Sequence, residues 1–134
     1  MYEVTHREEF DSGHRLKGYI GPCECLHGHR YFVEATVCGE VLDSLGMLFD
    51  FSNLKKAMRE LVARWDHKTI LNPEDQLRRE LLTKELAIMQ AGNPTAENMV
   101  AEFYQSLKPL LPAGIQLVKV RLYETPDNFV DYYE

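Results

Sequence analysis

Residues 27–37 read HGHRYFVEATV and alternate apolar and polar side chains in the pattern of a half-buried β-strand. The odd positions form one apolar face, made of Tyr31, Val33, Ala35 and Val37. Successive side chains of a strand point to opposite faces of the sheet, so His27 and His29 extend this same face. The stretch therefore predicts a strand that carries two histidines at the margin of the core.

The two histidines suggest a metal site. They lie roughly 7 Å apart on an extended chain, from which both imidazoles can reach one ion. Gly28 between them leaves the opposite face open. His14, at the end of FDSGH (residues 10–14), offers a third ligand. Three histidines with an open fourth position are typical of a catalytic zinc ion. The plainer interpretation of an isolated HxH pair is two polar residues at the start of a strand.

Two cysteines provide an alternative metal site. Cys23, Cys25, His27 and His29 would form a closed, structural zinc site. In an extended chain these residues span about 20 Å, so that site requires a tight turn at residues 23–25. The odd total of three cysteines otherwise indicates free thiols in a reducing compartment.

Composition sets the outer bounds. The chain has 134 residues, a length that predicts a single domain over residues 1–134, and its net charge is −6. No run approaches the ~20 apolar residues of a membrane span, and no secretory signal opens the chain, so we expect a cytoplasmic protein. Basic residues form no strong cluster, which argues against nucleic acid or an anionic membrane as partner. A small-molecule enzyme and a zinc-stabilised interaction domain both fit.

Three further segments predict strands: Tyr2 to about Phe10, residues 47–51 and residues 116–124. In the last of these, Val118, Val120 and Leu122 share one face, and Glu124 follows on it. A buried carboxylate needs a partner, and two adjacent N–H donors of a pterin or guanine ring would satisfy it. If the strand ends early, Glu124 is simply solvated.

Two segments have the apolar spacing of amphipathic helices. The first runs over residues 54–65, with Asp50 or Ser52 as its N-cap. The second begins after Thr95, its expected cap, and ends at Pro109 and Pro112. A third helix is expected around residues 77–89, where the apolar stripe is less regular. The buried face of the second helix comprises Ala96, Met99, Val100, Phe103 and Leu107.

The end of the first helix carries another candidate site. A loop at that point would let Asp66 orient His67 as a general base. A histidine at a helix end is also favoured by the helix dipole alone. Cys23 would serve as a nucleophile or as a proton donor and acceptor if a neighbouring charge lowers its pKa. A buried, unreactive cysteine is the alternative.

Six segments, in this order along the chain, resemble the family of 6-pyruvoyltetrahydropterin and 6-carboxytetrahydropterin synthases, which are tunnelling-fold enzymes. They are FDSGHRL (10–16), CECLHGH (23–29), GMLFDF (46–51), WDH (65–67), NPTAEN (93–98) and YETP (123–126).

The resemblance implies a role for each candidate residue. The zinc ligands would be His14, His27 and His29. The proton-transfer group would be Cys23, Asp66 and His67. The residues that bind the pterin would be Glu124 and Thr95.

The resemblance also implies the reaction. Zinc would polarise the side-chain hydroxyls of 7,8-dihydroneopterin triphosphate. The expected product is 6-carboxy-5,6,7,8-tetrahydropterin, with release of acetaldehyde and triphosphate, on the route to queuosine. The alternatives are 6-pyruvoyltetrahydropterin, or 6-hydroxymethyl-dihydropterin for folate where a glutamate replaces the cysteine. Glu24 directly follows Cys23; on an extended chain only Cys23 shares the face of His27, which favours cysteine chemistry.

The family fold implied is α+β: an antiparallel four-stranded sheet with two main helices on one face. Oligomerisation would close the sheets into a barrel and remove their exposed edges. Members usually form a homo-hexamer of two trimers with active sites between subunits. The segment 72–92 is longer than in compact members, and the sequence assigns it no role.

Overall fold

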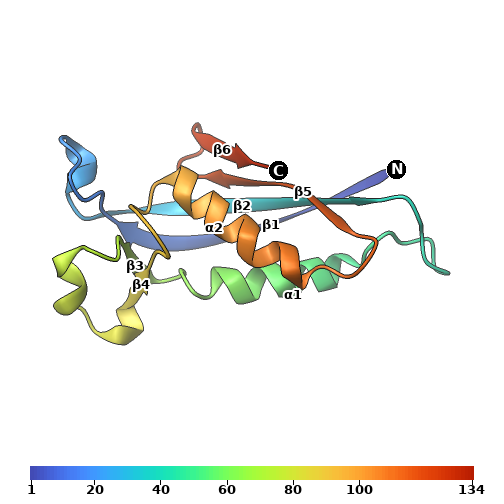
Figure 1. Ribbon diagram of the computed structural model, residues 1–134, viewed down its shortest axis with the longest axis horizontal. Coiled ribbons are helices and arrows are strands. Elements are labelled where there is room, and N and C mark those ends of the chain that lie inside the picture. The colour runs from blue at the N-terminus through green and yellow to red at the C-terminus, as the bar shows by residue number, and fades with distance from the viewer.

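Two long antiparallel strands form the centre of the sheet in the computed structural model, which describes residues 1–134 (Figure 1). β1 (Tyr2–His14) pairs with β2 (His27–Gly39) along their whole length. Beyond β2 lie β5 (Gln116–Tyr123) and β6 (Phe129–Tyr132), both antiparallel to their neighbours. Beyond β1 lie β3 (Lys68–Leu71) and β4 (Leu86–Ile88), which are paired in parallel.

The prediction of four antiparallel strands is therefore wrong in the number of strands and in the direction of two pairings. The sheet has six strands in the order β4-β3-β1-β2-β5-β6. The additional strands are the short ones at its margins, of three or four residues each. The class is α+β, as expected.

Two predicted elements are wrong. Residues 47–51 form no strand, because the Asp43 carboxylate accepts bonds from the backbone N–H groups of Leu45 and Met47 and closes a turn there. Residues 77–89 form no long helix. They contain the short 3-10 turns η2 (Gln76–Arg79) and η3 (Thr83–Glu85), and then β4, whose backbone groups pair with β3.

The helices α1 (Phe51–Val62) and α2 (Ala96–Leu107) both lie on one face of the sheet (Figure 1). Their predicted caps are confirmed: Asp50 accepts a hydrogen bond from Ser52 N, and Thr95 accepts one from Asn98 N. α1 begins and ends three residues earlier than the predicted range 54–65, although Trp65 beyond its end is still buried in the core. A 3-10 turn, η4 (Lys108–Leu110), follows α2. Neither helix is long and apolar enough to cross a membrane.

The core lies between the helices and the apolar face of β2. Tyr31, Val33, Ala35 and Val37 are all fully buried, as the alternation predicts. β5 differs from the prediction because it contains a bulge: Thr36 pairs with Lys119, but Val37 pairs with Leu117. The extra residue, Val118, breaks the alternation, so Leu117 enters the core in its place.

Candidate metal centre and active site

The three predicted metal ligands meet at the ends of the two central strands. His14 is paired directly with His27 across β1 and β2, and Ser12 with His29. Both strands are longer than predicted, so all three histidines lie within regular sheet. His14 Nε2 is 3.1 Å from His27 Nε2, and one ring nitrogen of each histidine lies within 4.8 Å of the other two.

Backbone carbonyls fix the orientation of two of the rings. His14 Nδ1 lies 2.8 Å from the carbonyl oxygen of Pro94, and His27 Nδ1 lies 2.7 Å from that of Cys25. A carbonyl oxygen can only accept, so each Nδ1 carries the hydrogen and donates it. In the neutral rings each Nε2 therefore presents a lone pair, which is the arrangement found in histidines that bind metals.

The arrangement of these nitrogens fits a metal ion. Two lone pairs that face each other at 3.1 Å repel unless a proton or a cation lies between them. His29 Nε2 is also buried and has no hydrogen-bond partner, which is rare for a buried polar atom. One ion bound to all three nitrogens would remove the repulsion between the two lone pairs and give His29 Nε2 a partner. Ligand nitrogens of a tetrahedral zinc ion lie about 3.3 Å apart, given bonds of 2.0–2.1 Å.

Burial favours the neutral form, which binds metal, in two of the three histidines. His14 is almost fully buried, and this burial lowers its pKa; partial burial likewise lowers the pKa of His29. The Tyr31 hydroxyl lies 3.1 Å from His14 Nδ1, and burial raises the pKa of Tyr31, so it stays protonated. The alternation predicted Tyr31 only as a core residue. Its contact with the His14 ring is a feature of the site that the sequence pattern did not predict.

The closed site that would include both cysteines is not formed. The group that could hold a metal ion consists of the three histidines alone. Cys25 is exposed and contributes its carbonyl oxygen, not its thiol, to His27.

Cys23 and Glu24 do not lie on an extended strand. Residues Pro22–Glu24 form a 3-10 turn, η1, so the alternation of an extended strand does not apply to them. Cys23 is nevertheless half-buried while Glu24 is exposed. A bond from Leu16 N to the Cys23 carbonyl holds the turn against the chain that follows His14.

Glu124 lies beside the metal centre. β5 ends at Tyr123, and Glu124 follows with its side chain 28% exposed and its Oε1 3.7 Å from His29 Nε2. The alternative expectation, that the strand ends early and Glu124 is solvated, is thus only partly confirmed. Glu124 and Thr95 line one cavity of about 320 Å³, and the Thr95 hydroxyl is already occupied as the cap of α2. The other lining residues are Leu16, Ala96, Glu97, Asn128, Phe129 and Val130.

Asp66 and His67 are held to β1 beyond the end of α1. Asp66 Oδ1 accepts a bond from Asp11 N, and His67 N donates one to Asp11 O. His67 has a φ of 57°, in the left-handed region, and its side chain is 79% exposed. The two side chains are 3.8 Å apart at their nearest charged atoms, too far for a hydrogen bond.

His67 lines a hollow of about 340 Å³ that also includes His29. Gly13 and Gly28 face each other across the two strands there, and both line the hollow. A side chain at Gly28 would lie 3.2 Å from the backbone oxygen of Ser12. The three histidines and Glu124 therefore lie close together. His67 does not contact them and shares with them only the hollow that His29 also lines. No hydrogen bond or ion pair connects Cys23 with Asp66 or His67.

Comparison with known proteins gives a consistent result. Residues 3–134 match the family described as 6-pyruvoyl tetrahydropterin synthase. A 6-carboxy-5,6,7,8-tetrahydropterin synthase of Rickettsia felis is 35% identical, over 98% of this chain and 99% of its own. The protein of that name from Haemophilus influenzae is 29% identical over the full length of both chains.

The fold is also shared with solved structures. The 6-pyruvoyl tetrahydropterin synthase of Caenorhabditis elegans has a TM-score of 0.76 and 25% identity, over 99% of this chain and 95% of its own. An uncharacterized protein from Wolinella succinogenes superimposes with a TM-score of 0.86 at 21% identity, over 99% and 98% of the two chains. The chain described here belongs to the 6-pyruvoyl tetrahydropterin synthase family.

Proposed function

We propose that the protein is a 6-carboxy-5,6,7,8-tetrahydropterin synthase. It would convert 7,8-dihydroneopterin triphosphate to 6-carboxy-5,6,7,8-tetrahydropterin and release acetaldehyde and triphosphate. The observation that carries this proposal is the set of relatives at 29–35% identity over essentially the whole chain that bear this name. The three convergent histidine nitrogens support it independently.

The metal in this proposal is zinc. His14, His27 and His29 would hold it, and three neutral imidazoles with an open position are the ligand set of a catalytic zinc ion. When bound, zinc supplies a Lewis acid that polarises the side-chain hydroxyls of the substrate.

Glu124 would hold the pterin ring. Its carboxylate can accept two adjacent N–H groups of the aminopyrimidinone edge, and it is partly withdrawn from solvent at the wall of the 320 Å³ cavity. Thr95 would contribute mainly as the cap that fixes the first turn of α2 at that same wall.

Cys23, Asp66 and His67 would move the protons. Cys23 lies in η1, next to the strand that carries two of the ligands. His67 lines the hollow that reaches His29, and the nearest oxygen of the Asp66 carboxylate lies 3.8 Å from its ring.

The active enzyme would be an oligomer. A side chain that is 79% exposed, as His67 is, cannot enclose a substrate without a further surface above it. The sheet also leaves β4 and β6 as open edges, which invite pairing with another copy. A homo-hexamer with active sites between subunits, as is usual in the family, would provide both.

The second candidate is a 6-pyruvoyl tetrahydropterin synthase. A relative named 6-pyruvoyl tetrahydrobiopterin synthase, from Pongo abelii, is 32% identical over 97% of this chain. Both reactions would begin with the same substrate and metal, so the metal centre does not distinguish them.

Product analysis tests the proposal. The zinc-loaded protein is incubated with 7,8-dihydroneopterin triphosphate, the pterins are separated by chromatography, and acetaldehyde is measured with an alcohol dehydrogenase. We expect 6-carboxytetrahydropterin and acetaldehyde in equal amounts, and neither from metal-free protein. A main product of 6-pyruvoyltetrahydropterin without acetaldehyde would support the second candidate instead.

A further inference from the structure

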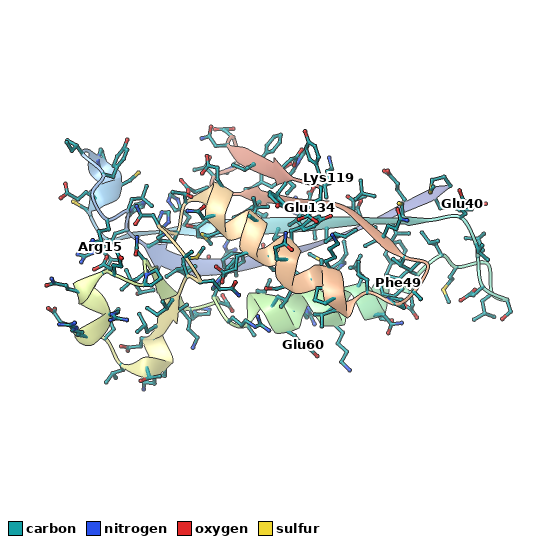
Figure 2. The ribbon with its side chains drawn as sticks, in the orientation of Figure 1. Arg15, Glu40, Phe49, Glu60, Lys119 and Glu134 are labelled. Carbon is teal, nitrogen blue, oxygen red and sulfur yellow. The ribbon has the colours of Figure 1, made fainter.

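The segment between β3 and α2 packs against the chain that follows His14. It contains η2, η3 and β4, and the sequence assigned it no role. Figure 1 shows it at the same end of the molecule as η1, and Figure 2 shows Arg15 beside it. Arg15 forms a bidentate pair with the buried Asp75 of this segment. The backbone that leaves the first metal ligand is therefore held by residues about 60 to 80 positions away.

Asn93 makes most of these connections. Its Oδ1 accepts bonds from Lys17 N, at 3.0 Å, and from Asn72 Nδ2, at 2.9 Å. Its Nδ2 donates to Lys17 O at 2.9 Å. One amide side chain thus joins the chain after His14 to the chain after β3.

The backbone of Asn93 is held as well. Its carbonyl oxygen accepts bonds from Thr95 N, at 2.8 Å, and from Asn98 Nδ2, at 2.9 Å. Between these anchors lies Pro94, whose ring fixes its own φ. The direction of the Pro94 carbonyl is therefore set by Asn93 on one side and by the cap of α2 on the other.

The Pro94 carbonyl is the acceptor for His14 Nδ1, at 2.8 Å. His14 is consequently held twice by the same loop, once through its ring and once through the backbone three residues later at Lys17. A shift of the loop would move the ring and the strand end together.

From these contacts we propose that Asn93 is a positioning residue of the metal centre. It sets the Pro94 carbonyl, and through it the orientation of His14, while its amide clamps Lys17. The segment 72–94 is then an outer support of the metal site, and the cavity wall at Thr95 is fixed by the same loop. This inference rests on the proposed metal centre.

The test measures metal binding as well as activity. The variant is Asn93→Ala; Asn72→Ala, which removes only one of the bonds to Asn93, is the milder second variant. The control is Asp43→Ala, because Asp43 also holds a loop by accepting two backbone bonds. Asp43 lies in the segment between β2 and α1. Glu40 and Phe49, which flank it in the sequence, are labelled in Figure 2 at the end of the molecule opposite to Arg15.

Three quantities are recorded for each protein. They are the affinity for Zn²⁺ by competition with a chromophoric chelator, the visible absorption of bound Co²⁺, and the unfolding temperature without metal. We expect Asn93→Ala to bind zinc about tenfold more weakly, as is usual when an outer partner of a metal ligand is lost, with a changed Co²⁺ spectrum. Asn72→Ala should show a smaller loss, and Asp43→Ala a lower unfolding temperature with wild-type affinity.

The contrary outcomes separate the two proposals. A wild-type protein that binds no zinc would overturn the metal centre itself. A wild type that binds zinc, with Asn93→Ala and Asn72→Ala at the same affinity and with the same Co²⁺ spectrum, would overturn this inference alone. An equal loss of affinity in Asp43→Ala would also overturn it, because the effect would then be general destabilisation.

Discussion

His14 and His27 form the last directly opposed pair of the β1–β2 ladder, with their Nε2 atoms 3.1 Å apart. The convergence of the three histidines is thus a consequence of strand register. Side chains opposite each other on one face of an antiparallel pair, such as His14 and His27, have their Cβ atoms about 5 Å apart. His29 is the next residue on that face of β2 and lies diagonally across from His14. A slip of one residue would turn His27 to the other face and disperse the site.

The first prediction concerns the ligands. His29→Ala should lose both zinc and activity, because two imidazoles remain and the site loses its third donor. Metal content is measured by elemental analysis after dialysis against a defined free zinc concentration. Cys25→Ala is the control and should keep one zinc per chain, since Cys25 contributes only a backbone carbonyl. Full metal content in His29→Ala, or its loss in Cys25→Ala, would show that the ligand set is different.

The second prediction concerns proton transfer. Cys23→Ala and His67→Ala should each lower turnover at least ~100-fold, the usual scale for general acid–base groups, while zinc stays bound. Neither residue belongs to the metal-binding group, so metal content should not change. Cys38→Ala is the matched control because Cys38 is also half-buried but lies at the far end of β2. Near-normal turnover in both variants would remove these residues from the mechanism.

The third prediction concerns the pterin. Glu124→Gln keeps the shape of the side chain but places a donor opposite the N–H groups of the ligand. Loss of a charge-assisted hydrogen bond costs about 1.5–3 kcal/mol, so affinity for 7,8-dihydroneopterin should fall about 10- to 100-fold. Calorimetry measures it, with Asp127→Asn, an exposed carboxylate of the same turn, as the control. Unchanged binding by Glu124→Gln would assign the ring to another residue.

The fourth prediction uses the pH dependence of stability. Hydrogen bonds from Arg15 hold the pKa of Asp75 below its ordinary value, and Leu77 N donates a further bond to it. A carboxyl whose folded pKa is depressed contributes stability above its unfolded pKa and loses it as the pH falls through the folded value. Asp75→Asn should therefore cost about 1–3 kcal/mol of unfolding free energy at neutral pH.

That difference should shrink below about pH 4, where the carboxyl of the unfolded chain takes up its proton. Denaturant unfolding of metal-free protein between pH 7 and pH 3 measures it. Glu74→Gln is the control. The Glu74 side chain is 81% exposed and its ion pair with Lys17 Nζ is long, at 3.7 Å, so it contributes little to stability. A difference that stays constant down to pH 3 would contradict the assigned pKa shift.

Strong local patterns made much of this structure predictable. The alternation of residues 31–37 gave the buried face of β2 correctly, because one face of that strand packs on the helices. The caps Asp50 and Thr95 were predictable because a side chain that accepts from the first turn acts over two or three residues. His27 and His29 followed from the same alternation, whereas His14 was a candidate because a third histidine completes the ligand set of a catalytic zinc ion.

Features that depend on pairing were not predictable in this way. β3, β4 and β6 have three or four residues each, too few to show a period, and exist because a neighbouring strand takes up their backbone bonds. The bulge at Val118 appears only in the pairing of β5 with β2. Because of it, Leu117 lies in the core where Val118 was expected. The second partner of the His14 and His27 rings is a backbone carbonyl, at Pro94 and Cys25, and carbonyls carry no sequence signal.

The last prediction concerns the choice between Cys23 and Glu24 as the base. The 3-10 turn removes the argument from strand alternation, but burial favours Cys23: it is half-buried, whereas Glu24 is exposed. A base must reach the substrate within hydrogen-bond distance, and of these two neighbouring side chains Cys23 is the one withdrawn from solvent. We therefore expect wild type and Glu24→Ala to give mainly 6-carboxytetrahydropterin and Cys23→Ala to give little. Chromatography of the products from the three proteins, each loaded with zinc, provides the measurement. A wild type that makes mainly 6-hydroxymethyl-dihydropterin, with loss of that product only in Glu24→Ala, would identify Glu24 as the base.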